Sequence, residues 1–321
     1  GLIFEGEPQA RAGRGRPSEL LHLRPASANF LGFKLTGDAL YAAVTDLHAE
    51  VSESEEHPLV NRDVSSVVRL IGEVANRLHA RYPRLAAIGV CSAGDVQDVG
   101  GRLLLVDSPF LGWDTVPLAE LVSEATGLPT VISNDVQALT AAHHWFGAGV
   151  GCRTIALIGF GAGIGSGIVV NDELVTGSRG HPGKVGHIPV TEGGPTCDAG
   201  HVGCVSAYVT IPSIVRNAHA ASYPSALKLA RAGEPTALAA MQAAGKALGV
   251  AIVQLANFID PEKIIVTGEG LPLVGLANET ILTTISNLLD PAADDVTVDF
   301  HEFRFSDYAW AAAISAIRLV V

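Results

Sequence analysis

The chain of 321 residues has few residues of the kinds that mark secreted or membrane proteins. Its four cysteines, at positions 91, 152, 197 and 204, are too few and too scattered for a disulfide framework. No uninterrupted apolar run reaches the roughly 18 residues needed to span a membrane, and no signal-peptide pattern stands at the start. These absences argue against a disulfide scaffold and against a membrane partner, and we expect the reducing cytoplasm as the location.

Basic residues and methionine are also scarce. The chain has 21 Lys and Arg against 33 Asp and Glu, which gives a net charge of −12. This acidity opposes non-specific binding to nucleic acid, so DNA contact requires a local basic segment or residues outside this sequence. Met241 is the one methionine and the chain opens with Gly1, so we expect the natural start to lie upstream.

The abundant residues indicate a globular α/β protein. Hydrophobic residues make up 48% of the chain, with 35 glycines and 17 prolines spread along it, and the length corresponds to about two domains. Residues 30–52 are predicted to form a strand, a turn and two further strands. The same order returns at 154–175 around a glycine turn, which makes a weak internal repeat. Apolar spacing predicts helices at 65–81, 117–126, 136–146, 235–255, 276–288 and 308–319, and buried strands at 85–90, 130–133, 263–267 and 296–300.

Three stretches in the middle of the chain carry the most specific pattern. They are Ser133-Asn134-Asp135, GFGAGIGSG at 159–167, and GHPGKVGHIPVTEGGPTCDAGHVGC at 180–204. Together they resemble the sugar and metal sites of the ROK family, which contains sugar kinases and sugar-responsive transcriptional repressors. The resemblance covers residues 28–321 and implies an actin-like ATPase fold, in which two ribonuclease-H-like α/β domains face a cleft.

The same resemblance implies domain boundaries. Residues 28–134 would form the N-terminal actin-like domain, on which the C-terminal helix 307–321 packs back. Residues 135–306 would form the second domain, with a degenerate zinc-type loop at 187–204.

The first 27 residues contain a short basic segment. From composition alone, the arginines between glycine and proline predict a flexible, solvated linker. ROK repressors, however, carry a winged helix-turn-helix followed by a Gly-Arg-Pro linker and a short strand. Residues 1–27 resemble the end of such a wing and its linker, which would include Arg14, Arg16 and Pro17. The resemblance therefore implies a DNA-reading helix that lies upstream and is missing from this sequence.

The two turns that hold phosphates in the family kinases are altered. The first reads Asp-x-Gly-Gly-Thr in those kinases, but here Lys34 replaces the metal-organising carboxylate and Asp38 places a negative charge where an anion would sit. Two like charges at about 4 Å repel by about 4 kcal/mol at an effective dielectric constant of 20. The second turn keeps its glycines but has Ala162 in place of a hydroxyl residue. We therefore predict that the chain is not a kinase.

Asn134 and Asp135 match the pair that binds sugar in the family kinases, where the aspartate is the general base. They follow a predicted strand and precede a predicted helix. Either residue also suits the N-cap of that helix, and the two roles are compatible.

Other expected effector-binding positions depart from the family pattern. Phe110 replaces an asparagine, and Lys184 and Ser206 each replace a glutamate, whereas His187 is retained. A neutral sugar would lose several hydrogen bonds of about 0.5–1.5 kcal/mol each. Lys184 favours a charged ligand, such as a sugar phosphate. The alternative is a pocket that binds no ligand.

The family zinc site uses one histidine and three cysteines, a strong tetrahedral pattern. His187, Cys197 and Cys204 are kept, but Ala199 occupies the middle ligand position. Asp198 or His201 would supply the fourth ligand, and His201 suits a thiolate-rich site better. The alternative is a loop held by backbone hydrogen bonds without metal.

Three hypotheses for function remain at this point. In the first, the chain is the effector-binding and dimerisation region of a ROK-type regulator, a homo-oligomer (dimer or tetramer) that responds to a sugar or sugar derivative. In the second, it is a sugar kinase with an atypical nucleotide site. In the third, it is a ligand-free dimer scaffold.

Overall fold

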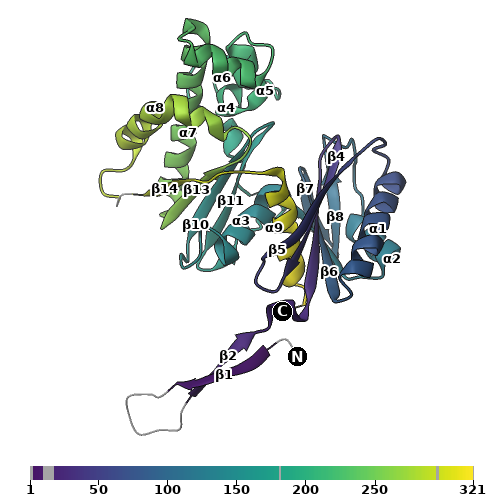
Figure 1. Ribbon diagram of the computed structural model, residues 1–321. Coiled ribbons are helices and arrows are strands. Elements are labelled where there is room, and N and C mark those ends of the chain that lie inside the picture. The colour runs from purple at the N-terminus through teal and green to yellow at the C-terminus, as the bar shows by residue number, and fades with distance from the viewer. Residues whose placement is uncertain (1–2, 10–17, 181, 294–295, 321) are drawn as a thin grey trace. The chain divides into compact units, whose positions relative to one another are not determined.

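A computed structural model describes residues 3–9, 18–180, 182–293 and 296–320. The chain divides into two compact units: unit 1 comprises Gly1–Ala138 with Phe305–Val321, and unit 2 comprises Leu139–Arg304. The division falls inside helix α3 (Asp135–Phe146), so Asp135, which we expected to open the second domain, lies in unit 1. Each unit contains a five-stranded sheet with helices, which confirms the predicted α/β class (Figure 1).

The sheet of unit 1 has the order β5–β4–β3–β6–β9. Strands β3, β6 and β9 are parallel, and β4 and β5 continue the sheet in antiparallel fashion. The strands are β3 (Asn29–Leu35), β4 (Ala39–Asp46), β5 (Val51–Pro58), β6 (Leu85–Ser92) and β9 (Thr130–Asn134). The helices are α1 (Val64–Arg81), α2 (Leu118–Thr126) and α9 (Phe305–Ile317), and a 3-10 turn spans Pro25–Ser27.

Alternate residues of β3 face opposite layers. Leu31, Phe33 and Leu35 join the apolar cluster formed with α1 and α2. Residues on the other face meet α9, which lies on the opposite side of the sheet (Figure 1). A Cβ atom on Gly32 would lie 1.9 Å from the carbonyl oxygen of Ala309, so α9 approaches the sheet this closely only because the residue is glycine.

The sheet of unit 2 has the order β12–β11–β10–β13–β14. The strands are β10 (Ile155–Phe160), β11 (Ile164–Val170), β12 (Glu173–Leu174), β13 (Lys263–Thr267) and β14 (Thr297–Phe300). The helices are α4 (Ser206–Val209), α5 (Ile211–Asn217), α6 (Tyr223–Arg231), α7 (Pro235–Ile259) and α8 (Val274–Leu288), with 3-10 turns at Val185–His187 and Leu271–Leu273.

Helix α7 is the central helix of unit 2. Its length and apolar composition would suffice to cross a membrane, but 67% of the relevant stretch is buried inside the unit. Small residues let α8 pack closely on it: a Cβ on Gly245 would lie 2.5 Å from the Cβ of Ala277. The apolar surface of α7 is therefore used within the protein core.

Two further hairpins complete the described chain. Strand β1 (Ile3–Gln9) pairs antiparallel with β2 (Ser18–Leu23), in the segment that we expected to hold the end of a wing. The predicted linker residues Arg14, Arg16 and Pro17 lie outside the described residues. The hairpin of β7 (Asp95–Val99) and β8 (Arg102–Asp107) was not predicted, because its strands are short and half polar.

Candidate functional site

Lys34 and Asp135 meet at the carboxyl edge of the unit 1 sheet. Lys34 pairs in register with Cys91 of β6, and Asp135 directly follows β9, so the three parallel strands end side by side. The ammonium group of Lys34 donates a hydrogen bond to Oδ2 of Asp135. Lys34 is 3% exposed and Asp135 7% exposed, so this ion pair is buried.

The neighbours of the pair complete a closed environment. The Lys34 ammonium also lies 4.3 Å from the centre of the Tyr308 ring, at a distance suited to a cation–π contact. Oδ1 of Asp135 accepts a hydrogen bond from the Val136 N–H at 2.8 Å. Burial raises the pKa of the adjacent Cys91 thiol to about 12, so this cysteine remains protonated. Each carboxylate oxygen of Asp135 therefore accepts a hydrogen bond from the protein itself.

Asn134 caps helix α3. Its side-chain oxygen accepts from the N–H groups of Val136 at 3.0 Å and Gln137 at 3.2 Å. Its amide nitrogen donates to the carbonyl of Gly94 at 2.9 Å. Asn134 is thus the N-cap residue of α3, and both the oxygen and the nitrogen of its side-chain amide form hydrogen bonds.

The first turn, between β3 and β4, forms hydrogen bonds within itself. Oγ1 of Thr36 donates to Oδ1 of Asp38 at 2.8 Å and accepts from the N–H of Ala39 at 2.9 Å. Gly37 packs against the Phe110 carbonyl, which a Cβ would approach to 3.1 Å, while the Phe110 side chain is 46% exposed. The groups that hold phosphates in family kinases are here used by the turn and by Asp38.

A carboxylate also stands against the second turn. The N–H of Gly161 donates to the carbonyl of Gly163 at 2.8 Å, with Ala162 exposed at the tip. A Cβ on Gly161 would lie 1.8 Å from Oε2 of Glu269. Gly268 and Gly270 resemble a glycine pair that flanks the adenosine in family kinases, but the sequence gave no sign that the Glu269 carboxylate between them reaches Gly161. The signal that was available is a long acidic side chain between Gly268 and Gly270.

The loop 187–204 brings four metal-ligating side chains together. The donor atoms of His187, Cys197, His201 and Cys204 all lie within 4.8 Å of one another. Sγ of Cys197 lies 3.8 Å from Nδ1 of His187 and 3.7 Å from Nδ1 of His201, and Sγ of Cys204 lies 3.8 Å from Nδ1 of His187. Asp198, the other candidate ligand, instead faces Arg216 at 3.5 Å.

These spacings fit a tetrahedral zinc ion. Ligand distances of about 2.0–2.1 Å for nitrogen and about 2.3 Å for sulfur place tetrahedral donors about 3.4–3.8 Å apart. Three sulfur–nitrogen distances, at 3.7–3.8 Å, lie at the upper end of this range, and the two imidazole nitrogens, at 3.0 Å, lie below it. The donor set of two imidazoles and two thiols is one that zinc prefers.

The local electrostatics also suit a metal site. Burial opposes ionisation of Cys197, but N–H groups of His201, Ala199 and Gly200 outweigh it, so the pKa of this thiol is lowered. Burial raises the pKa of Cys204. Burial, together with His201 and Lys184, lowers the pKa of His187, which keeps its imidazole neutral and able to ligate.

Backbone hydrogen bonds also hold this loop. The Cys197 N–H donates to the His201 carbonyl and the Gly200 N–H to the Cys197 carbonyl, both at 2.9 Å. All four cysteines are free thiols. The metal-free alternative therefore has a physical basis, although it does not explain why four ligating side chains converge.

The expected effector residues fall into two groups. Phe110, Asn134 and Asp135 belong to unit 1, and Lys184, His187 and Ser206 belong to unit 2. Within unit 2, Ser206 Oγ lies 2.4 Å from the position of a Cβ on Gly186, so it packs on the turn that carries His187. Lys184, directly before that turn, is exposed.

Comparisons with known proteins agree with this organisation. A family model described as the ROK family matches residues 30–317. A glucokinase of Halalkalibacterium halodurans is 28% identical over 303 residues, covering 86% of this chain and 90% of the relative. The DNA-binding transcriptional dual regulator NagC of Escherichia coli is 26% identical over 311 residues, covering 91% of this chain and 75% of the relative.

Solved structures share the fold. A ROK family transcriptional regulator, described as a homologue of the Escherichia coli MLC protein, superposes with a TM-score of 0.82 at 25% identity. It covers 98% of this chain and 85% of the regulator. A ROK hexokinase from Thermus thermophilus gives a TM-score of 0.79 at 24% identity, covering 91% of this chain and 99% of the hexokinase. The predicted actin-like fold is thereby confirmed.

Proposed function

Because this chain belongs to the ROK family, we propose that it is the effector-sensing part of a sugar-responsive transcriptional regulator and that it transfers no phosphoryl group. Its relatives include kinases and regulators, so membership alone does not choose between them. The observation that carries the proposal is the buried ion pair of Lys34 and Asp135.

The ion pair opposes phosphoryl transfer in two ways. A general base must lie within hydrogen-bond reach of the hydroxyl whose proton it takes, whereas the carboxylate of Asp135 is buried and held by a cation. Asp135 already accepts from the Lys34 ammonium and from the Val136 N–H. In addition, the cation of Lys34 stands where the family kinases organise Mg²⁺ with a carboxylate, and a buried positive charge repels a divalent cation.

The two phosphate turns support the same conclusion within each unit. Asp38 is hydrogen-bonded into the first turn, and the Glu269 carboxylate is packed on Gly161 of the second. Each places a negative charge where the family kinases hold phosphate oxygens. A phosphate group at either turn would have to displace the carboxylate of that turn or overcome its repulsion.

We infer that the effector is a sugar derivative with an acidic group, such as a sugar phosphate. Lys184 and Ser206 replace two family glutamates, which removes negative charge from this part of the site and adds a positive one. An ammonium and a hydroxyl both donate hydrogen bonds to anionic oxygens. His187 is retained near them and lies in the loop 187–204, which we call the metal loop.

The proposal includes a zinc ion held by His187, Cys197, His201 and Cys204. Such an ion would cross-link the two ends of the loop 187–204 and fix the orientation of His187. DNA contact is a further part of the proposed function, supported by the DNA-binding regulator among the relatives. A winged helix-turn-helix and assembly as a dimer or tetramer are proposed from the resemblance to ROK repressors alone.

A thermal-shift screen with the full chain tests the proposal. The panel contains neutral sugars, amino sugars and sugar phosphates, with Mg-ATP as a separate arm and a coupled assay for ADP release. A ligand at 100 times its dissociation constant adds about 2.7 kcal/mol, which shifts the midpoint by several degrees. We expect a shift with a sugar derivative and none with Mg-ATP. Sugar-dependent ADP release would establish a kinase instead, and no shift with any sugar would favour a scaffold.

A further inference from the structure

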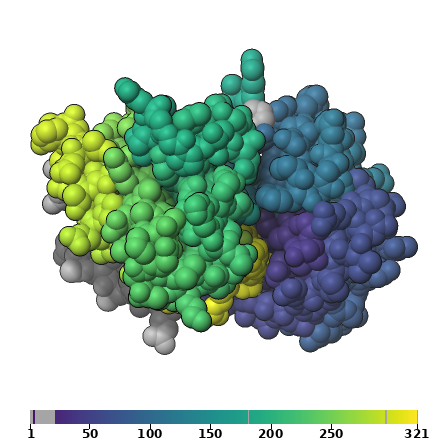
Figure 2. Space-filling view, turned by 90° about the horizontal axis from the view of Figure 1, so that it is seen from above, coloured from purple at the N-terminus to yellow at the C-terminus, as the bar shows by residue number. Residues whose placement is uncertain are grey.

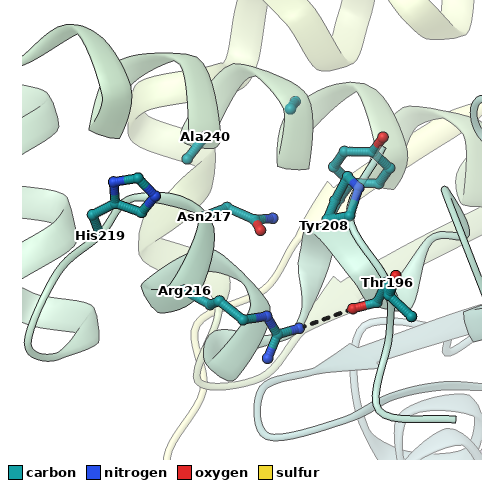
Figure 3. Close-up of a pocket in the computed structure, with 8 residues that line it drawn as sticks. Thr196, Tyr208, Arg216, Asn217, His219 and Ala240 are labelled. Atoms are coloured by element: carbon teal, nitrogen blue, oxygen red, sulfur yellow. Dashed lines mark hydrogen bonds between the residues drawn. The ribbon is translucent and has the colours of Figure 1, made fainter. Parts of the chain in front are cut away.

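A hollow of about 640 Å³ lies in unit 2 between the metal loop and helices α4, α5 and α7. Pro195 and Thr196 of the loop line one side, and Ala240 and Ala243 of α7 contribute methyl groups to another. Figure 3 shows Tyr208, Arg216, Asn217 and His219 arranged around it. The surface of α5 and α6, in green, faces the viewer in Figure 2.

The polar side chains of the hollow come from the end of one helix. Arg216 and Asn217 are the last residues of α5, and His219 follows with a backbone φ of +48°. This left-handed conformation is uncommon for a residue with a side chain. It turns the chain at the end of the helix so that the next N–H, that of Ala220, donates back to the Val215 carbonyl at 3.0 Å. The bend therefore keeps a guanidinium, an amide and an imidazole on one rim.

Arg216 also links this rim to the metal loop. Its guanidinium donates to the Thr196 carbonyl at 3.3 Å (Figure 3). It also donates to Ser213 Oγ at 3.0 Å and lies 3.5 Å from Oδ1 of Asp198. A guanidinium carries five N–H donors. Arg216 makes these three contacts within the described part of the chain, so some of its N–H groups remain available to a ligand. The Arg216 and Asp198 side chains are 47% and 78% exposed, so solvent weakens their attraction.

The wall of the hollow is rigid and partly apolar. Tyr208 is 9% exposed, and its hydroxyl is 2.8 Å from Thr191 Oγ1, which fixes the ring. A Cβ on Gly194 would lie 2.3 Å from the same hydroxyl, so the loop packs directly on it. A ligand in the hollow would contact an aromatic edge and small methyl groups below a cationic rim.

We propose that this hollow binds a small organic anion, with a phosphate or carboxylate group anchored by Arg216 and a carbon body against Tyr208, Ala240 and Ala243. An anionic group forms stronger, charge-assisted hydrogen bonds with a guanidinium than neutral groups do. It competes with Asp198, whose contact with Arg216 is long and exposed. The site is separate from the proposed sugar site and adjoins the metal ligand Cys197.

The chain contains a matched control. Arg153 and Asp172 form another exposed pair in unit 2, at 3.4 Å, with side chains 69% and 57% exposed. This pair resembles that of Arg216 and Asp198 in distance and exposure but does not line the hollow. Substitutions in the two pairs therefore separate a site-specific effect from a general loss of positive charge.

The test is isothermal titration of the full chain with three probes that share a ring: phenyl phosphate, benzoate and neutral benzyl alcohol. We expect saturable binding of at least one anion, weakened at least about tenfold in Arg216→Gln and unchanged in Arg153→Gln. Asp198→Asn should tighten binding, and Asp172→Asn should not. The stronger anion identifies the preferred group.

Several outcomes would overturn the proposal: no saturable binding by the unmodified chain, equal weakening in both arginine variants, or equal binding of benzyl alcohol. Asp198→Asn keeps the test decisive if Arg216→Gln fails to fold, because it changes an exposed side chain and predicts a gain. Because the probes are not sugars, failure here is independent of the sugar screen.

Discussion

The ammonium of Lys34 and the carboxylate of Asp135, 101 positions apart in the chain, form a buried ion pair at the edge of the unit 1 sheet. The cation–π contact with Tyr308 adds the C-terminal helix α9 to this arrangement. Lys34 thus places a positive charge where the family kinases have a carboxylate, and the carboxylate of Asp135 compensates this charge.

This pair predicts a strong asymmetry between single and double substitutions. Lys34→Met leaves a buried carboxylate without its partner, and we expect a loss of about 3–5 kcal/mol in the free energy of unfolding. The double variant Lys34→Met with Asp135→Asn removes both charges and should lie within about 1–2 kcal/mol of the unmodified chain. Urea unfolding followed by circular dichroism measures both values.

The control for this prediction is Arg102→Met. Arg102 forms an exposed pair with Glu120, with side chains 57% and 44% exposed, so its loss should change the free energy of unfolding far less than Lys34→Met does. If Lys34→Met costs no more than Arg102→Met, the buried pair lacks the energetic role assigned to it.

The metal loop predicts zinc in protein purified without chelator. We expect one equivalent of zinc by elemental analysis, and a loss of most of it in His201→Ala or Cys204→Ser, because a tetrahedral structural site needs all four ligands. Asp198→Asn should retain zinc, since Asp198 faces Arg216. Cys152→Ser is the cysteine control. Only trace zinc in the unmodified chain would refute the site, and zinc loss in Asp198→Asn would assign the fourth ligand to that aspartate.

The sequence predicted the repeated strand and turn pattern because alternating apolar residues and glycines are local signals. The first two strands predicted within 30–52 lie at Asn29–Leu35 and Ala39–Asp46, and the helix predicted at 65–81 lies at Val64–Arg81. The hairpin β7–β8 was missed because most of its strand residues are polar or exposed. Its strands form through pairing with each other, which single-strand patterns do not reveal.

The candidate site was only partly predictable for a similar reason. The sequence identified Lys34 and Asp135 as unusual or important residues, but their contact depends on strands β3, β6 and β9 lying side by side. The reach of Glu269 to Gly161 is another long-range contact. His201 was the preferred fourth metal ligand because of its chemistry, and the structure places it with the other three.

The contact between β3 and α9 predicts a severe effect of one added methyl group. Gly32→Ala would place a Cβ 1.9 Å from the backbone oxygen of Ala309, and backbone cannot move away as a side chain can. We expect a loss of at least about 3 kcal/mol, at the upper end of overpacking effects. Gly163→Ala is the control, because no described atom lies within 4 Å of its Cβ position. Thermal unfolding compares the two, and equal midpoints would contradict the close approach.

Buried His143 predicts a loss of stability in mild acid. Burial, assisted by the nearby His301, lowers the pKa of His143 from 6.5 to about 4. Between these two pH values the unfolded chain binds a proton that the folded chain does not. The contribution of His143 to the free energy of unfolding is therefore complete above about pH 6.5 and decreases as the pH falls toward 4. The maximum decrease is about 3 kcal/mol. Urea unfolding between pH 7 and 4 gives the free energy of unfolding at each pH. This free energy should depend less steeply on pH in His143→Gln, whereas exposed His48→Gln should follow the unmodified chain. An unchanged slope in His143→Gln would mean that another group titrates in this range.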